Sequence, residues 1–180
     1  MKKYFITFLI IFISSTYSTG LTQTDSTLIV NTVLDYGEGY YSGSPERMES
    51  AIHPDLNKVS PEKIGMTGGI VLRNSTYSGL IELCRNKIGM LDESKRNISV
   101  AVLKIDGDMA FARLNSAKFN DYVQLGRIDG KWKIINVLWT YGSDVKRDKI
   151  PDDAEREKIK EAVKNAVTGY YEGLFTGNLL

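Results

Sequence analysis

The stretch that decides the fold is FNDYVQLGRIDGKWKIINVLWTY, residues 119–141, in which two apolar runs flank the pair Asp129-Gly130. An Asp-Gly pair between two such runs is typical of a two-residue turn with positive φ, so the stretch predicts a β-hairpin. We expect helices or another chain to cover one face of the hairpin, because it holds too many large apolar side chains for a sheet with both faces in water. These side chains are Val123, Leu125, Ile128, Trp132, Ile134, Ile135, Val137, Leu138 and Trp139.

The segments before this hairpin predict two more strands, and helices ahead of them. Residues 98–105 and 109–117 favour strands joined through Asp106-Gly107, which with the hairpin makes four consecutive antiparallel strands. Three earlier segments predict helices, because their apolar residues recur at helical spacing or because a capping residue precedes the segment. These predicted helices are residues 26–41, 45–52 and 78–86, with an irregular stretch at 53–74 that holds one short strand at 70–72. Helices followed by an antiparallel sheet predict an α+β domain in which the helices close over one curved face.

Length, composition and charge limit the classes of protein that fit. A chain of 180 residues with 42% hydrophobic content can build one domain with a real core plus an appendage. The net charge is +1, from 23 Lys plus Arg against 22 Asp plus Glu. A chain with so little net charge has no strong electrostatic field to attract the phosphates of a nucleic acid over a distance. We therefore expect no nucleic acid partner.

The N-terminus carries the pattern of a secretory signal peptide over residues 1–20. Lys2 and Lys3 precede an apolar run at 4–13 and a small polar stretch at 14–20. The run is about half as long as a membrane-spanning helix requires, although an uncleaved anchor is the alternative. The sequence predicts export to the periplasm or the exterior, and no membrane association after cleavage.

Only one cysteine, Cys84, and one histidine, His53, are present. A single cysteine excludes an intramolecular disulfide, and we expect it to be a small buried hydrophobic residue. The two residues supply too few nitrogen and sulfur ligands for zinc, and no dinucleotide motif is present. We therefore expect no metal and no cofactor, although residue counts alone leave open a carboxylate-based calcium site.

The tail, residues 153–180, follows a charged linker at 144–152 and predicts an amphipathic helix. Its Gly-Tyr-Tyr-x-Gly at 169–173 repeats the pattern at 39–43 at an offset of 130 residues. The tail therefore predicts the first helix of a truncated second copy of the domain. A chance similarity between two amphipathic helices is the alternative.

Three segments together resemble the nuclear transport factor 2-like superfamily, and most closely its putative lumazine-binding family. They are GYYSGSPERM at 39–48, HPDL at 53–56 and the hairpin at 119–139, within a domain spanning 26–143. The resemblance implies a cone-shaped α+β fold, a pocket between the helices and a curved sheet, and a dimer formed through the outer sheet face. The superfamily includes ketosteroid isomerases, polyketide cyclases, dehydratases and members of no known activity, so the fold does not choose the function.

Asp121 and His53 are the candidate catalytic residues. Asp121 alternates with apolar residues on one strand face, so it can project into an apolar cavity, where burial would raise its pKa and suit it to acid–base work. The alternative is a structural Asp121 that pairs with a loop or with Arg113. His53 can serve as a general base facing the same cavity, or it can play a structural role at a helix end.

The candidate ligand-pocket residues are polar groups among apolar neighbours and large aromatic side chains. The polar groups are Arg113 and Asn136, each on a predicted strand face with apolar residues. The aromatic ones are Tyr40, Tyr41 and Trp139, which can line a pocket or fill the core.

Three functions fit the sequence. The first is an exported domain that binds a small apolar or amphipathic molecule, with homodimerisation through the outer sheet face. The second is a cofactor-free isomerase, cyclase or dehydratase that uses Asp121 and His53. The third is a protein-interaction module that uses the sheet surface together with the tail helix.

Overall fold

A computed structural model of the chain describes residues 23–64, 68–142 and 152–177. The chain divides into two compact units, an N-terminal unit, Met1–Gly142, and a C-terminal unit, Ser143–Leu180. The predicted signal peptide and all of the predicted linker before residue 152 lie outside the described residues. In the described ranges, no helix combines the length and the apolar character needed to cross a membrane.

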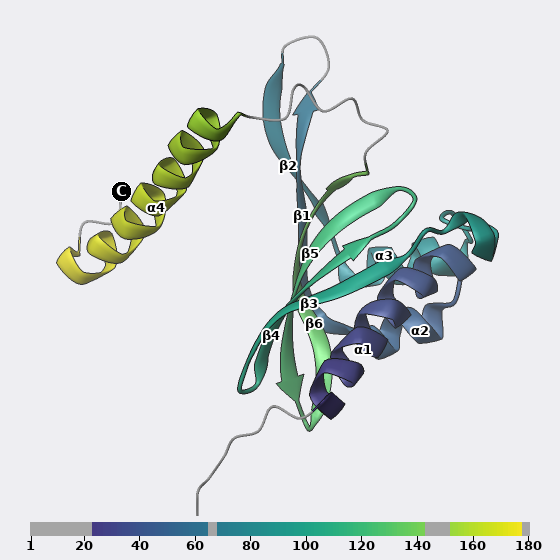
Figure 1. Cartoon of the computed structure of the whole chain (residues 1–180). Helices are drawn as coiled ribbons and strands as arrows, with labels where there is room; N and C mark the ends of the chain where they lie inside the picture. The colour runs from purple at the N-terminus through teal and green to yellow at the C-terminus, as the bar shows by residue number, and fades with distance from the viewer. Residues whose placement is uncertain (1–22, 65–67, 143–151, 178–180) are drawn as a thin grey trace, which may run out of the picture. The chain divides into compact units, whose positions relative to one another are not determined.

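The N-terminal unit confirms the predicted α+β fold. Helices α1 (Gln23–Ser42), α2 (Pro45–Ala51) and α3 (Tyr77–Arg85) cover one face of a curved six-stranded sheet (Figure 1). The start of α2 follows from its sequence, because the Ser44 side chain accepts a hydrogen bond from the backbone N–H of Arg47, and proline occupies the first helical position.

The strands follow the order β2-β1-β6-β5-β4-β3 across the sheet, with a parallel pairing between β1 and β6 and antiparallel pairings elsewhere. Their bounds are β1 Ile52–Ile64, β2 Gly69–Ser75, β3 Ser99–Asp106, β4 Met109–Asn115, β5 Phe119–Ile128 and β6 Lys131–Tyr141. The predicted hairpin is confirmed as β5 and β6. Its turn residues Asp129 and Gly130 have φ of 49° and 74°, the positive values that the turn requires.

Strand β1 is where the sequence prediction of an irregular stretch at 53–74 is wrong. Leu56, Lys58 and Ser60 alternate as its buried residues, and two of these three are polar, so the period of two carries no apolar signal. Pro54 and Pro61 also argued against a strand. Pro54 lies at an irregularity in the pairing with β6, and Pro61 lies beyond the end of that pairing at Val59.

A β-bulge in β6 changes which face its residues occupy. Gln124 pairs with Asn136, whereas the next residue, Leu125, pairs with Ile134, so Ile135 is the extra residue. Ile134 therefore faces the helices, while Asn136 faces away from them. In an unbroken strand the two residues would share a face, so the expectation from alternation that Asn136 faces the same way as Ile134 is wrong.

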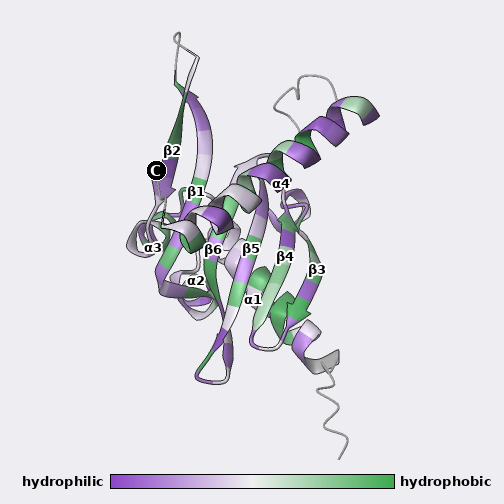
Figure 2. Cartoon of the chain, turned by 90° about the vertical axis from the view of Figure 1, so that its left-hand side faces the viewer, coloured by the Kyte–Doolittle hydropathy of each residue, from purple (hydrophilic) through white to green (hydrophobic). Residues whose placement is uncertain are grey.

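The sheet has two faces of different character. The inner face, toward the helices, carries buried residues such as Leu114, Val123 and Trp139. Figure 2 shows hydrophilic and hydrophobic residues mixed along β4, β5 and β6. Phe111, Tyr122 and Leu138 lie exposed on the outer face. Without a partner, the outer face of this unit therefore presents large apolar groups to water.

Cys84 lies in the core, as the sequence predicts, with no exposed surface. Burial raises its thiol pKa to about 11. The thiol is therefore protonated and inert near neutral pH.

The described part of the C-terminal unit is one helix, α4 (Asp153–Thr176). Large apolar side chains along it are exposed, among them Val167, Tyr170 and Phe175. Both α1 and α4 are followed by a glycine with left-handed φ, Gly43 at 68° and Gly177 at 72°. When the two glycines are aligned, the helices are offset by 134 residues. The repeated Gly-Tyr-Tyr-x-Gly pattern gives an offset of 130 residues, so the two alignments differ by about one helical turn. A second copy of the domain stays a prediction.

Gly39 allows α1 to pack closely on α2, because a Cβ at this position would lie 2.9 Å from the backbone nitrogen of Met48. We expect Gly39→Ala to lower the free energy of unfolding by about 1–3 kcal/mol, measured by urea titration. Gly169→Ala in α4 is the matched control, since a Cβ there meets nothing within 4 Å. Equal urea midpoints for the two variants would contradict the close packing.

Candidate functional site

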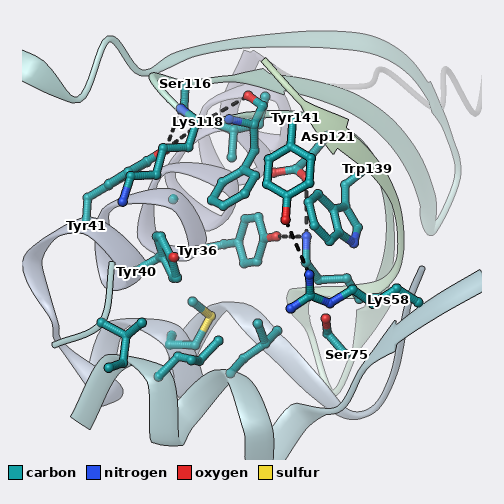
Figure 3. Close-up of a pocket in the computed structure, with 18 residues that line it drawn as sticks. Tyr36, Tyr40, Tyr41, Lys58, Ser75, Ser116, Lys118, Asp121, Trp139 and Tyr141 are labelled. Carbon is teal, nitrogen blue, oxygen red and sulfur yellow. Dashed lines mark hydrogen bonds and ion pairs between the residues drawn. The ribbon is translucent and has the colours of Figure 1, made fainter. Parts of the chain in front are cut away.

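A cavity of about 360 Å³ lies within the N-terminal unit, between the inner sheet face and the covering helices (Figure 3). Its floor is formed by buried side chains, including Tyr36 from α1, Lys58 from β1 and Asp121 from β5. Its rim includes the exposed residues Ile88 and Tyr141. The cavity therefore runs from solvent to a polar floor deep in the unit.

The floor is a buried cluster of Lys58, Asp121 and Tyr36. The Nζ atom of Lys58 donates hydrogen bonds to Tyr36 Oη at 2.7 Å and to Asp121 Oδ1 at 3.3 Å. Lys58 is 7% exposed and Asp121 2% exposed. An ion pair at this depth is costly to desolvate, so each charge depends on the other for its stability.

Trp139 forms the wall beside this cluster. The Lys58 Nζ atom lies 4.7 Å from the centroid of its ring, a cation–π distance. The indole Nε1 of Trp139 is buried and has no hydrogen-bond partner within the described residues. An unpaired buried donor is unfavourable, so the Trp139 ring is held in place by its packing and not by a hydrogen bond within the described residues.

Burial controls the protonation of the cluster. It raises the pKa of the Asp121 carboxyl and lowers that of the Lys58 ammonium, and in each case the attraction between the two groups opposes the effect. Burial also holds the pKa of the Tyr36 hydroxyl well above its usual value, and the Asp121 charge adds to this rise. Both shifts bring the pKa values of Lys58 and Asp121 closer together, which lowers the cost of moving a proton from the amine to the carboxyl.

Aromatic rings continue the wall from the floor to the rim. Tyr40 packs edge to face on Phe119 at 5.5 Å between centroids, Phe119 on Trp139 at 5.3 Å, and Trp139 on Tyr141 at 5.2 Å. All four rings line the cavity. Such a wall suits a flat, apolar ligand.

The structure brings together four of the seven residues that the sequence singles out, since Tyr40, Tyr41, Asp121 and Trp139 line the cavity. His53 does not line it. Its Nδ1 accepts a hydrogen bond from the backbone N–H of Asp55 at 3.2 Å, at the start of β1. His53 and Asp121 therefore do not face a common cavity.

Arg113 and Asn136 lie on the outer sheet face and do not line the cavity. Arg113 donates to the side chain of Asn115, and Asn136 donates to Gln124. The ion pair considered between Arg113 and Asp121 is replaced by the pair between Lys58 and Asp121.

Sequence reasoning missed Lys58 and Tyr36. Tyr36 carried a usable signal, because it continues the helical row of Ile29 and Val33 toward Tyr40 at spacings of four, three and four. Lys58 carried none, since a lysine in a polar segment with two prolines is most often a solvated loop residue. Among the described residues, no group of His, Cys, Asp and Glu is placed to hold a metal ion.

Comparisons with known proteins agree with this fold. A family model described as "Putative lumazine-binding" matches residues 24–140. An NTF2-like protein of unknown function from Methylobacillus flagellatus KT has a TM-score of 0.51 at 22% identity, and the match covers 69% of this chain and 97% of that one. One from Silicibacter pomeroyi DSS-3 has a TM-score of 0.51 at 14% identity, over 68% of this chain and 100% of that one. No curated protein matches. At these identities, the solved structures show the fold alone.

Removing one member of the buried pair should destabilise the protein more than removing both. We expect Lys58→Met to lower the free energy of unfolding by about 3–5 kcal/mol near neutral pH, because Asp121 is left buried without its cation. The double variant Lys58→Met with Asp121→Leu should recover most of that loss. Lys104→Met, which removes an exposed lysine of β3, should change stability by less than about 0.5 kcal/mol.

The loss in Lys58→Met should also depend on pH. Burial raises the folded-state pKa of Asp121, and without Lys58 the main opposing influence is gone. Such a group contributes stability below its unfolded pKa and loses it as the pH rises through the folded pKa. Urea titrations should therefore show the smallest deficit near about pH 4 and the largest near about pH 8. A deficit that is constant across this range would contradict the buried carboxyl.

Proposed function

The chain belongs to the putative lumazine-binding family of the nuclear transport factor 2-like superfamily, and from this membership we infer that its cavity binds a small amphipathic organic molecule. The family match confirms the resemblance found in the sequence. The observation that carries the proposal is an aromatic cavity that ends on a buried lysine–aspartate pair.

The size and lining of the cavity support this ligand class. Its volume of about 360 Å³ falls at the lower end of the range for small-molecule pockets. The aromatic wall supports a flat ring, and the donor on Lys58 supports an acceptor at the buried end. The lining carries the cations Lys58, Arg73 and Lys118 against the single carboxylate of Asp121, so an anionic or carbonyl-bearing ligand is favoured.

Lumazine, which the family description names, is a planar heterocycle with ring carbonyls and has this chemistry. It is one member of the class that we propose. It therefore enters the test as a competitor rather than as the expected ligand.

The proposed binding can be tested with the dye 8-anilinonaphthalene-1-sulfonate, a flat aromatic anion. We expect saturable fluorescence enhancement with one dye per chain in the wild type. Leu83→Trp should weaken dye binding by about tenfold or more, because Leu83 lines the cavity and the larger ring would occupy it. The readout is a fluorescence titration.

Leu103→Trp is the matched control, since it makes the same change at an exposed residue of β3. It should bind the dye as the wild type does. Displacement of the dye by lumazine would place that heterocycle among the ligands. Equal affinities in the two tryptophan variants would show that the dye binds elsewhere and would contradict the proposal.

A proton-transfer enzyme is the second candidate function. The observation that favours it is the Asp121 carboxyl, buried on the cavity floor with a raised pKa. Because His53 lies outside the cavity, Tyr36 and Lys58 are the groups that would exchange protons with Asp121 in such an enzyme. The dye titration tests ligand binding, and its expected result is the same whether or not the protein has this activity.

We also propose that the outer sheet face pairs two copies of the chain. Four cross-strand neighbours form a row on this face, three of them apolar or aromatic and one of them a cation. They are Arg113, Tyr122, Leu138 and Val59. Tyr122 is 55% exposed and Leu138 49% exposed. Covering such a patch with a second copy would remove it from water.

Sedimentation velocity tests this pairing. The wild type should sediment as a dimer, and Tyr122→Lys should sediment as a monomer, because a charge would be buried in the interface. Asn31→Lys, at an exposed position of α1, should remain dimeric. A monomeric wild type at the highest soluble concentration would overturn the pairing.

A further inference from the structure

We propose that Lys58 is an amine nucleophile, which condenses with the carbonyl group of an aldehyde or ketone bound in the cavity to form an imine. Because the carbonyl compound must first enter the cavity, this proposal rests on the proposed function. It goes further in naming the reactive atom, Nζ of Lys58, and the chemical class of the substrate.

The position of Nζ is the first support. Lys58 reaches the cavity floor from β1, and its Nζ atom lies between Tyr36 on α1 and Asp121 on β5 (Figure 3). It lies 5.4 Å from the ring centroid of Tyr36 as well as 4.7 Å from that of Trp139. A carbonyl compound that stacks on the aromatic wall would therefore present its carbonyl carbon to this nitrogen.

The surroundings of the amine are the second support. Only an unprotonated amine carries the lone pair that attacks a carbonyl, and desolvation in an apolar pocket is a way to obtain one near neutral pH. Burial lowers the pKa of Lys58 and raises that of Asp121, so moving the shared proton from the amine to the carboxyl is easier here than in water. An exposed lysine lacks this arrangement.

The cluster also supplies the proton transfers that the condensation needs. The Nζ lone pair forms the C–N bond while the carbonyl π electrons move to oxygen, which takes a proton from the Asp121 carboxyl. The resulting carbinolamine loses its hydroxyl as water after a second protonation, and the two N–H protons return to Asp121. One amine and one carbonyl group thus give one imine and one water, and Asp121 ends as it began.

The Tyr36 hydroxyl, 2.7 Å from Nζ, is placed to hold the nitrogen in line with this exchange. Tyr36 is therefore a positioning residue in this scheme, while Lys58 and Asp121 contact the reacting atoms.

Other titratable groups that line the cavity lie farther from the floor or lack the pairing. Arg73, from β2, donates to Glu62 and to the Tyr141 hydroxyl near the rim. Lys118 has an exposed side chain, and its backbone N–H donates to the Tyr41 hydroxyl. Lys118 is thus a lysine of the same cavity without the buried carboxyl partner, and it serves as an internal comparison.

Reductive trapping tests the proposal on the full chain. Benzaldehyde is the probe, and sodium cyanoborohydride reduces any imine to a stable benzyl amine, which peptide mass spectrometry locates. We expect Lys58 to be labelled at least about tenfold faster than Lys118 or Lys104 near neutral pH, since each unit by which an amine pKa falls increases its unprotonated fraction about tenfold. Benzyl alcohol, which has the ring but no carbonyl, should slow the labelling of Lys58 by competition.

Two variants sharpen the result. Asp121→Asn removes the charge that raises the pKa of Lys58, yet it should slow the trapping at Lys58 about tenfold or more, because an amide cannot exchange the protons of the condensation. Lys104→Met should leave the labelling of Lys58 unchanged. The wild-type comparison among lysines needs no variant, so the proposal stays testable even where a substitution at Lys58 prevents folding.

Failure of this proposal is separable from failure of ligand binding. If the dye binds and benzyl alcohol displaces it, but Lys58 is labelled no faster than Lys104, the amine chemistry is refuted and the binding function stands. If neither the dye nor benzaldehyde reaches the cavity, both are refuted. Fast labelling of Lys58 that benzyl alcohol does not slow would also overturn the proposal, because the reaction would not pass through the cavity.

Discussion

The ion pair between Lys58 and Asp121 is the interaction on which the rest of the site depends. It joins β1 to β5, which are separated in the sheet by β6, and the Tyr36 hydroxyl ties α1 to the same point. Neither charge can be buried alone without a cost of several kcal/mol, so the three elements must meet in one arrangement. The pair therefore forms the polar end of the cavity, and we expect it to disfavour arrangements that separate these three elements.

The cavity exists because the unit leaves space above this pair rather than filling it. Gly37 lines it from α1, where a Cβ would lie 3.2 Å from a methyl carbon of Leu114, so this glycine lets α1 pack closely on β4. Gly39, two residues on, brings α2 close to α1 in the same way. A pair of glycines in one helix costs helix stability, and the close packing of α1 on β4 and on α2 offsets that cost.

Helices α1 and α4 share an amphipathic pattern, but their apolar rows differ in burial. Both are amphipathic, both carry a pair of tyrosines within their last two turns, and both precede a left-handed glycine. In α1 the row that contains Val33 is buried in the core, whereas Val163 and Val167 in α4 are 58% and 51% exposed. Periodicity thus identifies the face that is able to pack, but it carries no information about the surface that covers it.

The sequence by itself determined the features whose chemistry is local. The Asp129-Gly130 turn, the cap at Ser44, the apolar alternation of β5 and the family resemblance all depend on neighbouring residues, and the structure or the family match confirms each of them. Asp121 was placed on the inner face for the same reason. These elements decide the α+β class and one wall of the site.

Only the tertiary structure decided where Lys58 lies and which polar residues face the cavity. Strand β1 is held by pairings with β6 and β2 and not by its own propensity, so its polar inner face is invisible in the sequence. The bulge at Ile135 turns Asn136 outward through a pairing shift that no local signal marks. Pairing between distant segments brings a lysine and a carboxylate together, because the free energy of burying two opposite charges depends on both partners at once.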